Sequence, residues 1–144
     1  MSAEIKIIPE EIHLIRIDVL ESSITDVTES SGEMFSIHVG KSVMHHLDDE
    51  RIKIELHLDL SIPEKPAGGN ARFVIDFHFQ IENLRRFYEL KEDNKPLFSG
   101  LLIATLLGLS FSTSRGIVYE RLSNTHLKGI ILPVVDPGKM LEAE

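Results

Sequence analysis

The sequence of 144 residues contains neither cysteine nor tryptophan. Without cysteine, the chain can form no disulfide framework, no thiolate nucleophile and no thiolate metal site. Positive charge is also scarce: 15 Lys and Arg residues stand against 23 Asp and Glu residues, which gives a formal net charge of −8. Because this charge repels a phosphate backbone, we expect no nucleic-acid partner and favour a basic protein as a partner.

Targeting and membrane signals are weak. The first residues, MSAEIKIIPEE, contain no basic segment followed by an apolar core, so we expect no secretory signal and a cytoplasmic protein. Residues 97–114 are uncharged and reach the lower length limit for a bilayer span. Six hydroxyl residues interrupt this stretch, and no tryptophan is available for an interfacial belt. We therefore expect a buried helix rather than a membrane span.

Catalytic motifs are missing from the sequence. It has no GxSxG pattern and no glycine-rich phosphate loop, and the serines within 110–114 lie in a predicted helix without an adjacent histidine. We find no convergent set of acids and bases, so we expect a protein that is not an enzyme and needs no cofactor.

The seven histidines raise the question of a metal site. His57 and His78 could share a strand face with Asp76, but solvated cross-strand pairs explain this pattern equally well. His45 and His46 are adjacent, so on a strand they point to opposite faces. Because ligands must converge on one ion, we expect no metal site.

Two segments alternate strictly between apolar and polar residues. These are RIKIELHLDLSI at 51–62 and ARFVIDFHFQIE at 71–82, and both patterns predict strands with one buried face. The turn-rich segment between them predicts an antiparallel hairpin. Two less regular strands are expected at 12–20 and 34–44.

Charges on the outer face of this hairpin predict its register. We expect His57 opposite Asp76 and Glu55 opposite His78, because no like charges then face one another. A shift of two residues in either direction would place a second carboxylate, Asp59 or Glu55, opposite Asp76.

The remainder of the chain is predicted to be helical. Asn94 is a plausible cap and Pro96 suits a first turn, so a long helix is expected from about Pro96 to about Leu122. Asp136 and Pro137 suit the start of a short C-terminal helix. Four strands followed by two helices predict a single α+β domain over residues 1–144: a four-stranded antiparallel sheet with a long helix and a short C-terminal lid helix on one face.

The long helix is apolar almost all round, as GLLIATLLGLSFSTSRG at 100–116 shows, so it needs burial on more than one side. Small residues recur along it every four positions, which lets another backbone approach closely. We expect the same helix of a second subunit to cross this ridge, although a core helix can also hold small residues by chance. The ridge consists of Gly100, Ala104, Gly108, Ser112 and Gly116.

The last third of the chain resembles the end of the SecB export chaperones. Residues 109–141 read LSFSTSRGIVYERLSNTHLKGIILPVVDPGKML. They combine an aromatic residue, a segment of small residues and arginine that continues a helix, a threonine-containing turn, a Leu-Pro step and a short terminal helix. The order of four strands, long helix and lid helix is also similar to SecB over most of the chain. The resemblance implies an ATP-independent chaperone that assembles as a homotetramer, a dimer of dimers with its long helices between two sheet layers.

The resemblance also implies where partners would bind. Unfolded polypeptide clients would occupy an apolar groove lined by inward residues of the sheet and by five residues of the lid region: Leu132, Val134, Val135, Met140 and Leu141. A SecA-like motor would contact the outer sheet face at Glu21, Val74 and Asp76. Related family members protect antitoxins of toxin–antitoxin systems, so an antitoxin is a second partner to consider.

A function of another class stays open. The chain could be an inert oligomeric scaffold, or a specific protein-binding module of the same fold, with its lid packed shut. Suppression of client aggregation separates these alternatives, because only a chaperone needs exposed apolar surface for non-native polypeptide.

Overall fold

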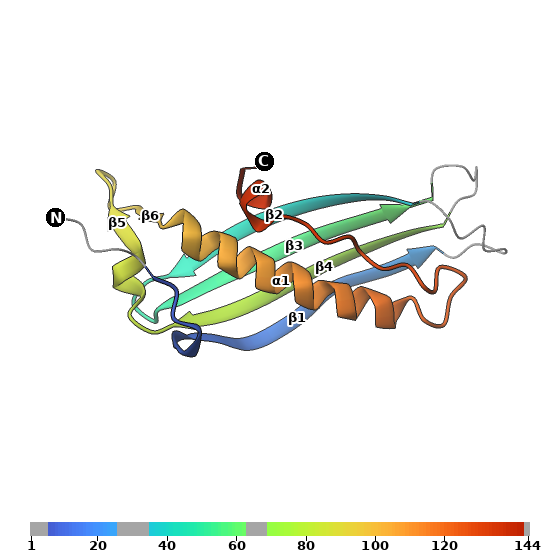
Figure 1. Ribbon diagram of the computed structural model, residues 1–144, viewed down its shortest axis with the longest axis horizontal. Helices are drawn as coiled ribbons and strands as arrows, with labels where there is room; N and C mark the ends of the chain where they lie inside the picture. The colour runs from blue at the N-terminus through green and yellow to red at the C-terminus, as the bar shows by residue number, and fades with distance from the viewer. Residues whose placement is uncertain (1–5, 26–34, 63–68, 143–144) are drawn as a thin grey trace.

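The computed structural model describes residues 6–25, 35–62 and 69–142, so most of the turn-rich segment at 63–70 and of the acidic, hydroxyl-rich segment TDVTESSGE at 25–33 lies outside the described residues. One antiparallel sheet contains four strands in the order β1-β4-β3-β2. The strands are β1 (Ile12–Thr25), β2 (Ser36–His46), β3 (Arg51–Ser61) and β4 (Asn70–Ile81). The helices α1 (Gly100–Arg121) and α2 (Pro137–Glu142) lie on one face of this sheet, as Figure 1 shows. The predicted fold class is confirmed.

Alternating apolar residues of β3 and β4 form the core beneath α1. Each strand buries five large apolar side chains on the helix side, none of them more than 3% exposed. These residues are Ile52, Ile54, Leu56, Leu58 and Leu60 of β3, and Phe73, Ile75, Phe77, Phe79 and Ile81 of β4. Full burial of one such side chain contributes about 1.5–3 kcal/mol, so this layer is the main source of stability.

The helix α1 packs on β3 and β4 and buries eight of its residues. By length and composition alone, this helix is long and apolar enough to cross a bilayer. In the structure it instead runs obliquely along the sheet (Figure 1). Its other side keeps Leu101, Leu109 and Tyr119 between 44% and 52% exposed. An apolar surface on α1 therefore remains uncovered by the described residues.

The first part of the small-residue ridge faces α2 of the same chain. A Cβ atom added to Gly108 would lie 3.0 Å from Cγ of Pro137, and one added to Gly100 would lie 3.4 Å from Cδ2 of Leu141. Few real Cβ contacts are as short as 3.0 Å, so the missing side chain at Gly108 lets α2 approach. These two glycines are explained without a second subunit.

The second part of the ridge is open. Ala104 is half-buried, whereas Ser112 and Gly116 are exposed. A Cβ atom at Gly116 would meet nothing within 4 Å in the described chain. Helix crossing between subunits at this end of α1 stays a prediction.

The predicted start of the long helix is wrong by four residues. Asn94 adopts a left-handed conformation (φ 57°) in a turn between two short paired strands, β5 (Tyr88–Leu90) and β6 (Pro96–Phe98). Asn tolerates this conformation, which suits it to a hairpin turn rather than a helix cap. The helix begins at Gly100, where Oγ of Ser99 accepts a hydrogen bond from the backbone N–H of Leu102 at 3.4 Å.

The predicted register of the β3–β4 hairpin is also wrong, by two residues. Asp59 lies opposite Arg72, and Glu55 lies opposite Asp76. A shift of two residues keeps every side chain on its own face, so alternation could not distinguish the registers. Opposed like charges cost about 0.2–1 kcal/mol, whereas one buried apolar side chain contributes about 1.5–3 kcal/mol. Packing of the core therefore outweighs the charge pattern.

Gly108→Leu is expected to displace α2, because overpacking a close contact costs about 1–3 kcal/mol. Trypsin should then cleave after Lys139 several-fold faster, while far-UV circular dichroism stays unchanged because leucine favours helix over glycine. Gly116→Leu is the matched control, since its Cβ meets no neighbour. Equal cleavage of the two variants would contradict the packing of α2 on Gly108.

Candidate functional site

A cavity of about 490 Å³ lies between β2 and the C-terminal part of the chain. Two residues of β2 form one side, and residues on either side of the start of α2 form the other. The lining residues are Val39, Lys41, Val134, Val135, Asp136, Lys139 and Met140. Because β3 contributes no lining residue, the cavity lies over the edge of the sheet rather than its centre.

The inner face of β2 is available because α1 packs on β3 and β4. Val39 lies opposite Leu58 and Lys41 opposite Leu56, so both project to the helix side of the sheet. Val43 lies on the same face farther along and is 36% exposed. The sheet thus presents an incompletely covered edge strand with one lysine among its inward apolar residues.

Three buried leucines hold the C-terminal segment in place after α1: Leu122, Leu127 and Leu132 are at most 3% exposed. Nε of Arg115 donates a hydrogen bond to the carbonyl oxygen of Leu132 at 3.0 Å, which ties this segment to the helix. The chain then leaves the core, and Val134 is 82% exposed. An apolar residue is thereby presented to solvent beside β2.

The start of α2 is fixed locally. Oδ1 of Asp136 accepts a hydrogen bond from the backbone N–H of Gly138 at 2.8 Å, and Pro137 occupies the first helical position. Both features are typical of helix N-termini, and they confirm the predicted start of this helix. They also orient Lys139 and Met140 so that both line the cavity.

Three of the five predicted lid residues line the cavity, namely Val134, Val135 and Met140. Leu132 is 1% exposed and belongs to the core. Leu141 does not line the cavity and instead lies close to Gly100 of α1. The structure therefore brings part of the predicted groove together and assigns the other two residues to packing.

Sequence reasoning did not place Val39, Lys41, Asp136 and Lys139 in the groove. Inward residues of the sheet were expected to line the groove, but none was named. The alternation in β2 indicates that Val39 and Lys41 point inward. A lysine at an inward position is unusual, because an ammonium group is rarely placed against a core without a function or a partner. Asp136 and Lys139 had no signal beyond their closeness to the predicted lid.

The outer face of the sheet brings together the three residues expected to dock a motor. Glu21 lies opposite Val74, and Asp76 lies two residues farther along β4. The Glu21 side chain is 42% exposed and pairs with Arg72 at 3.3 Å. Val74 and Asp76 are only 7% and 5% exposed. Docking at this face stays a prediction, and among the three Glu21 offers the most accessible side chain.

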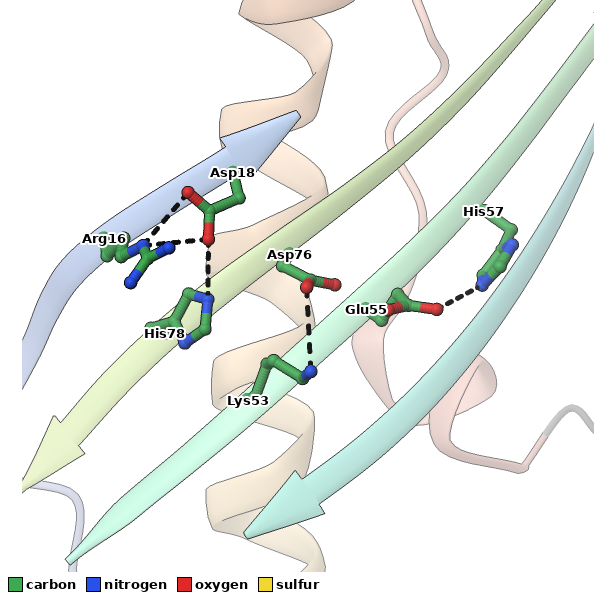
Figure 2. Close-up of polar contacts among 7 residues, drawn as sticks. All are labelled: Arg16, Asp18, Lys53, Glu55, His57, Asp76 and His78. Carbon is green, nitrogen blue, oxygen red and sulfur yellow. Dashed lines mark hydrogen bonds and ion pairs between the residues drawn. The ribbon is translucent and has the colours of Figure 1, made fainter. Parts of the chain in front are cut away.

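Three carboxylates lie in one row across this outer face. Asp76 on β4 has Asp18 of β1 on one side and Glu55 of β3 on the other. Figure 2 shows these groups projecting from the face opposite α1, each with a basic neighbour. The closest contacts are Arg16–Asp18 at 2.9 Å, His78–Asp18 at 3.1 Å, His57–Glu55 at 2.9 Å and Lys53–Asp76 at 3.7 Å. Within the described ranges, no group of three or more acidic and histidine side chains is arranged to hold a metal ion.

The central carboxyl group of the row differs from its neighbours. Burial raises the pKa of Asp76, and hydrogen bonding to Glu55 and the charge of Glu55 raise it further. The neighbouring Asp76 carboxyl group and, to a smaller extent, the contact with His57 at 2.9 Å hold the pKa of Glu55 below its usual value. The opposite shifts mean that the charged form of Asp76 is disfavoured beside Glu55, whereas the charged form of Glu55 is favoured.

Asp76→Asn should stabilise the protein at neutral pH. The raised pKa means that the folded state binds a proton on Asp76 more tightly than the unfolded state does, so this group lowers stability as pH rises above the ordinary carboxyl range. Asparagine carries no charge and therefore removes this effect. We expect a gain of roughly 0.5–1 kcal/mol at pH 7, vanishing near pH 3, by denaturant unfolding. Asp59→Asn is the control because Asp59 pairs with Arg72 at 2.9 Å; an equal gain there would contradict the explanation.

Comparison with known protein families and with curated proteins finds no match to this sequence. Among solved structures, the chain is similar to the Mycobacterium tuberculosis Rv1957 SecB-like chaperone in complex with a ChAD peptide from the Rv1956 HigA1 antitoxin. The TM-score is 0.64 and the identity 12%, over 88% of this chain and 91% of that chain. A protein of unknown function from Streptococcus agalactiae gives a TM-score of 0.42 and 14% identity, over 85% and 97% of the two chains. The first likeness shows that this chain has a SecB-like fold.

Proposed function

We propose that this protein is an ATP-independent chaperone that holds extended, non-native polypeptide in the cavity beside β2. The observation that carries the proposal is an apolar groove of about 490 Å³ with Val134 82% exposed at its margin. Exposed apolar side chains beside a cavity are typical of surfaces that bind protein segments. No catalytic step is part of the proposal.

The SecB-like fold supports this function. The similar solved structure is a SecB-like chaperone in complex with an antitoxin peptide. An antitoxin and an export client are therefore the two client classes we propose, in the cytoplasm. A SecA-like motor would be the partner for export, and Glu21 on the outer sheet face is the side chain best exposed for it.

The alternative is an oligomeric scaffold, or a module for one specific partner, with α2 closed over the groove. Helix α2 has only six residues, and it packs on the glycines of α1 rather than across β2. The open cavity that this leaves favours the chaperone.

We also propose that the protein assembles as a homotetramer, a dimer of dimers. Leu14 and Ile17 of β1 lie opposite Phe79 and Phe77, on the helix side of the sheet, yet both are 40% exposed. Because α1 does not cover this part of the face and has exposed leucines of its own, a second copy would bury both surfaces. Isologous packing of this kind is the commonest form of self-association.

Ile17→Glu tests the assembly. A carboxylate in a buried contact between copies is strongly unfavourable, so light scattering after size-exclusion chromatography should show a smaller species than the wild-type tetramer. Leu97→Glu is the control, because Leu97 lies on β6 away from this face and is 58% exposed. A wild-type monomer would reject the assembly.

Val134→Asp tests the holding function. The substitution places a charge at the margin of the groove and should abolish most suppression of aggregation of a reduced, unfolding client at stoichiometric ratios. Its melting temperature should match that of the wild type, because Val134 makes little contribution to the core. Ile131→Asp is the matched control, since Ile131 is 58% exposed on the same segment but does not line the cavity. Equal loss in both variants would reject the groove as the client site.

A further inference from the structure

Strand β2 has a free edge next to the cavity. It pairs with β3 on one side, and no strand among residues 6–25, 35–62 and 69–142 pairs with its other side. The backbone N–H and C=O groups along this edge therefore form no ladder with another described strand. An extended peptide can add to such an edge as a further strand, by forming main-chain hydrogen bonds with the sheet.

The two edges of the sheet differ in how well they can accept a strand. The pairing of β1 with β4 is interrupted twice, between Leu14 and Arg16 and between Val19 and Glu21. Such irregularities twist an edge strand and protect it from pairing. The pairing of β2 with β3 is regular over all eleven residues of β2, with no interruption and no proline. Of the two edges, β2 is therefore the one suited to accept an added strand.

The cavity defines what the added strand should carry. Alternate side chains of a strand paired with β2 would project to the same side of the sheet as Val39 and Lys41. There they would meet the apolar lining and two ammonium groups, those of Lys41 and Lys139. One carboxylate, that of Asp136, also belongs to the lining, so two positive charges stand against one negative charge. The lining is thus net positive in a chain whose formal net charge is −8.

We propose that β2 binds its client by strand addition, and that the cavity selects an extended segment in which apolar residues alternate with polar ones and an acidic side chain enters beside Lys139. This inference rests on the proposed chaperone function and specifies its mode of recognition. Main-chain hydrogen bonds make binding tolerant of sequence, and the cavity adds a preference for acidic, apolar segments.

A synthetic peptide as long as β2, eleven residues, tests the strand addition. It alternates valine with serine and has one central valine replaced by glutamate. Two further versions carry N-methyl groups on alternate amides, one set for each edge of the peptide strand. Fluorescence anisotropy with the full-length protein should show one methylated version binding like the parent and the other at least about tenfold weaker, because only one edge faces β2.

Several outcomes would overturn the inference. Equal affinity of the two methylated versions would mean that the protein forms no main-chain hydrogen bonds with one edge of the peptide. A parent peptide that fails to bind a protein that suppresses client aggregation would reject strand addition and leave the chaperone function standing. A protein that neither binds the peptide nor suppresses aggregation would reject both.

Lys139→Glu tests the preference for an acidic side chain. The parent peptide should bind roughly two- to fivefold more weakly to this variant, and a peptide with lysine in place of glutamate should bind more tightly. Lys128→Glu makes the same change of charge at an exposed residue outside the cavity lining and should alter neither affinity. Equal effects of the two substitutions would overturn the charge selection.

Discussion

Burial of the alternating apolar residues of β3 and β4 beneath α1 is the interaction on which the rest of the structure depends. This layer combines the three largest fully buried side chains, Phe73, Phe77 and Phe79, with the leucines of the helix. It fixes α1 over the two central strands, since only there can the helix cover a continuous apolar surface. The positions of every other element follow from this placement.

One helix over a four-stranded sheet leaves both edge strands incompletely covered. On the β1 side, Leu14 and Ile17 keep 40% of their surface exposed on the helix face. On the β2 side, the C-terminal segment returns over the sheet, but Leu132 anchors it to the core and α2 packs back on Gly108. The segment thus bridges the edge without filling it. The groove therefore forms because one helix cannot cover all four strands of the sheet.

The elements predicted best from the sequence were those governed by burial. The strict alternation in β3 and β4 fixed both strands and their faces, and the apolar run fixed α1 to within four residues at its start. The register could not be predicted, because two registers that differ by two residues bury the same faces, and how well each of them packs the core is not visible in the alternation. The candidate site was predicted in part. Val134, Val135 and Met140 were expected to line a groove because they belong to the predicted lid region, whereas the position of Lys139 depends on how α2 packs against α1. Such packing between elements leaves no local pattern in a single sequence.

On the outer face of the sheet, core packing rather than charge pairing determines which residues lie opposite one another. Core packing sets Glu55 opposite Asp76, which the pattern of charges alone disfavours. Burial and the neighbouring Glu55 carboxyl group raise the pKa of Asp76, so the charged form of Asp76 is disfavoured in the folded state. Among the described residues, Oδ1 of Asp76 is buried without a hydrogen-bond partner, and Oδ2 lies 3.7 Å from Nζ of Lys53. The raised pKa of Asp76 is therefore a consequence of the register, because core packing places this buried carboxyl group opposite Glu55.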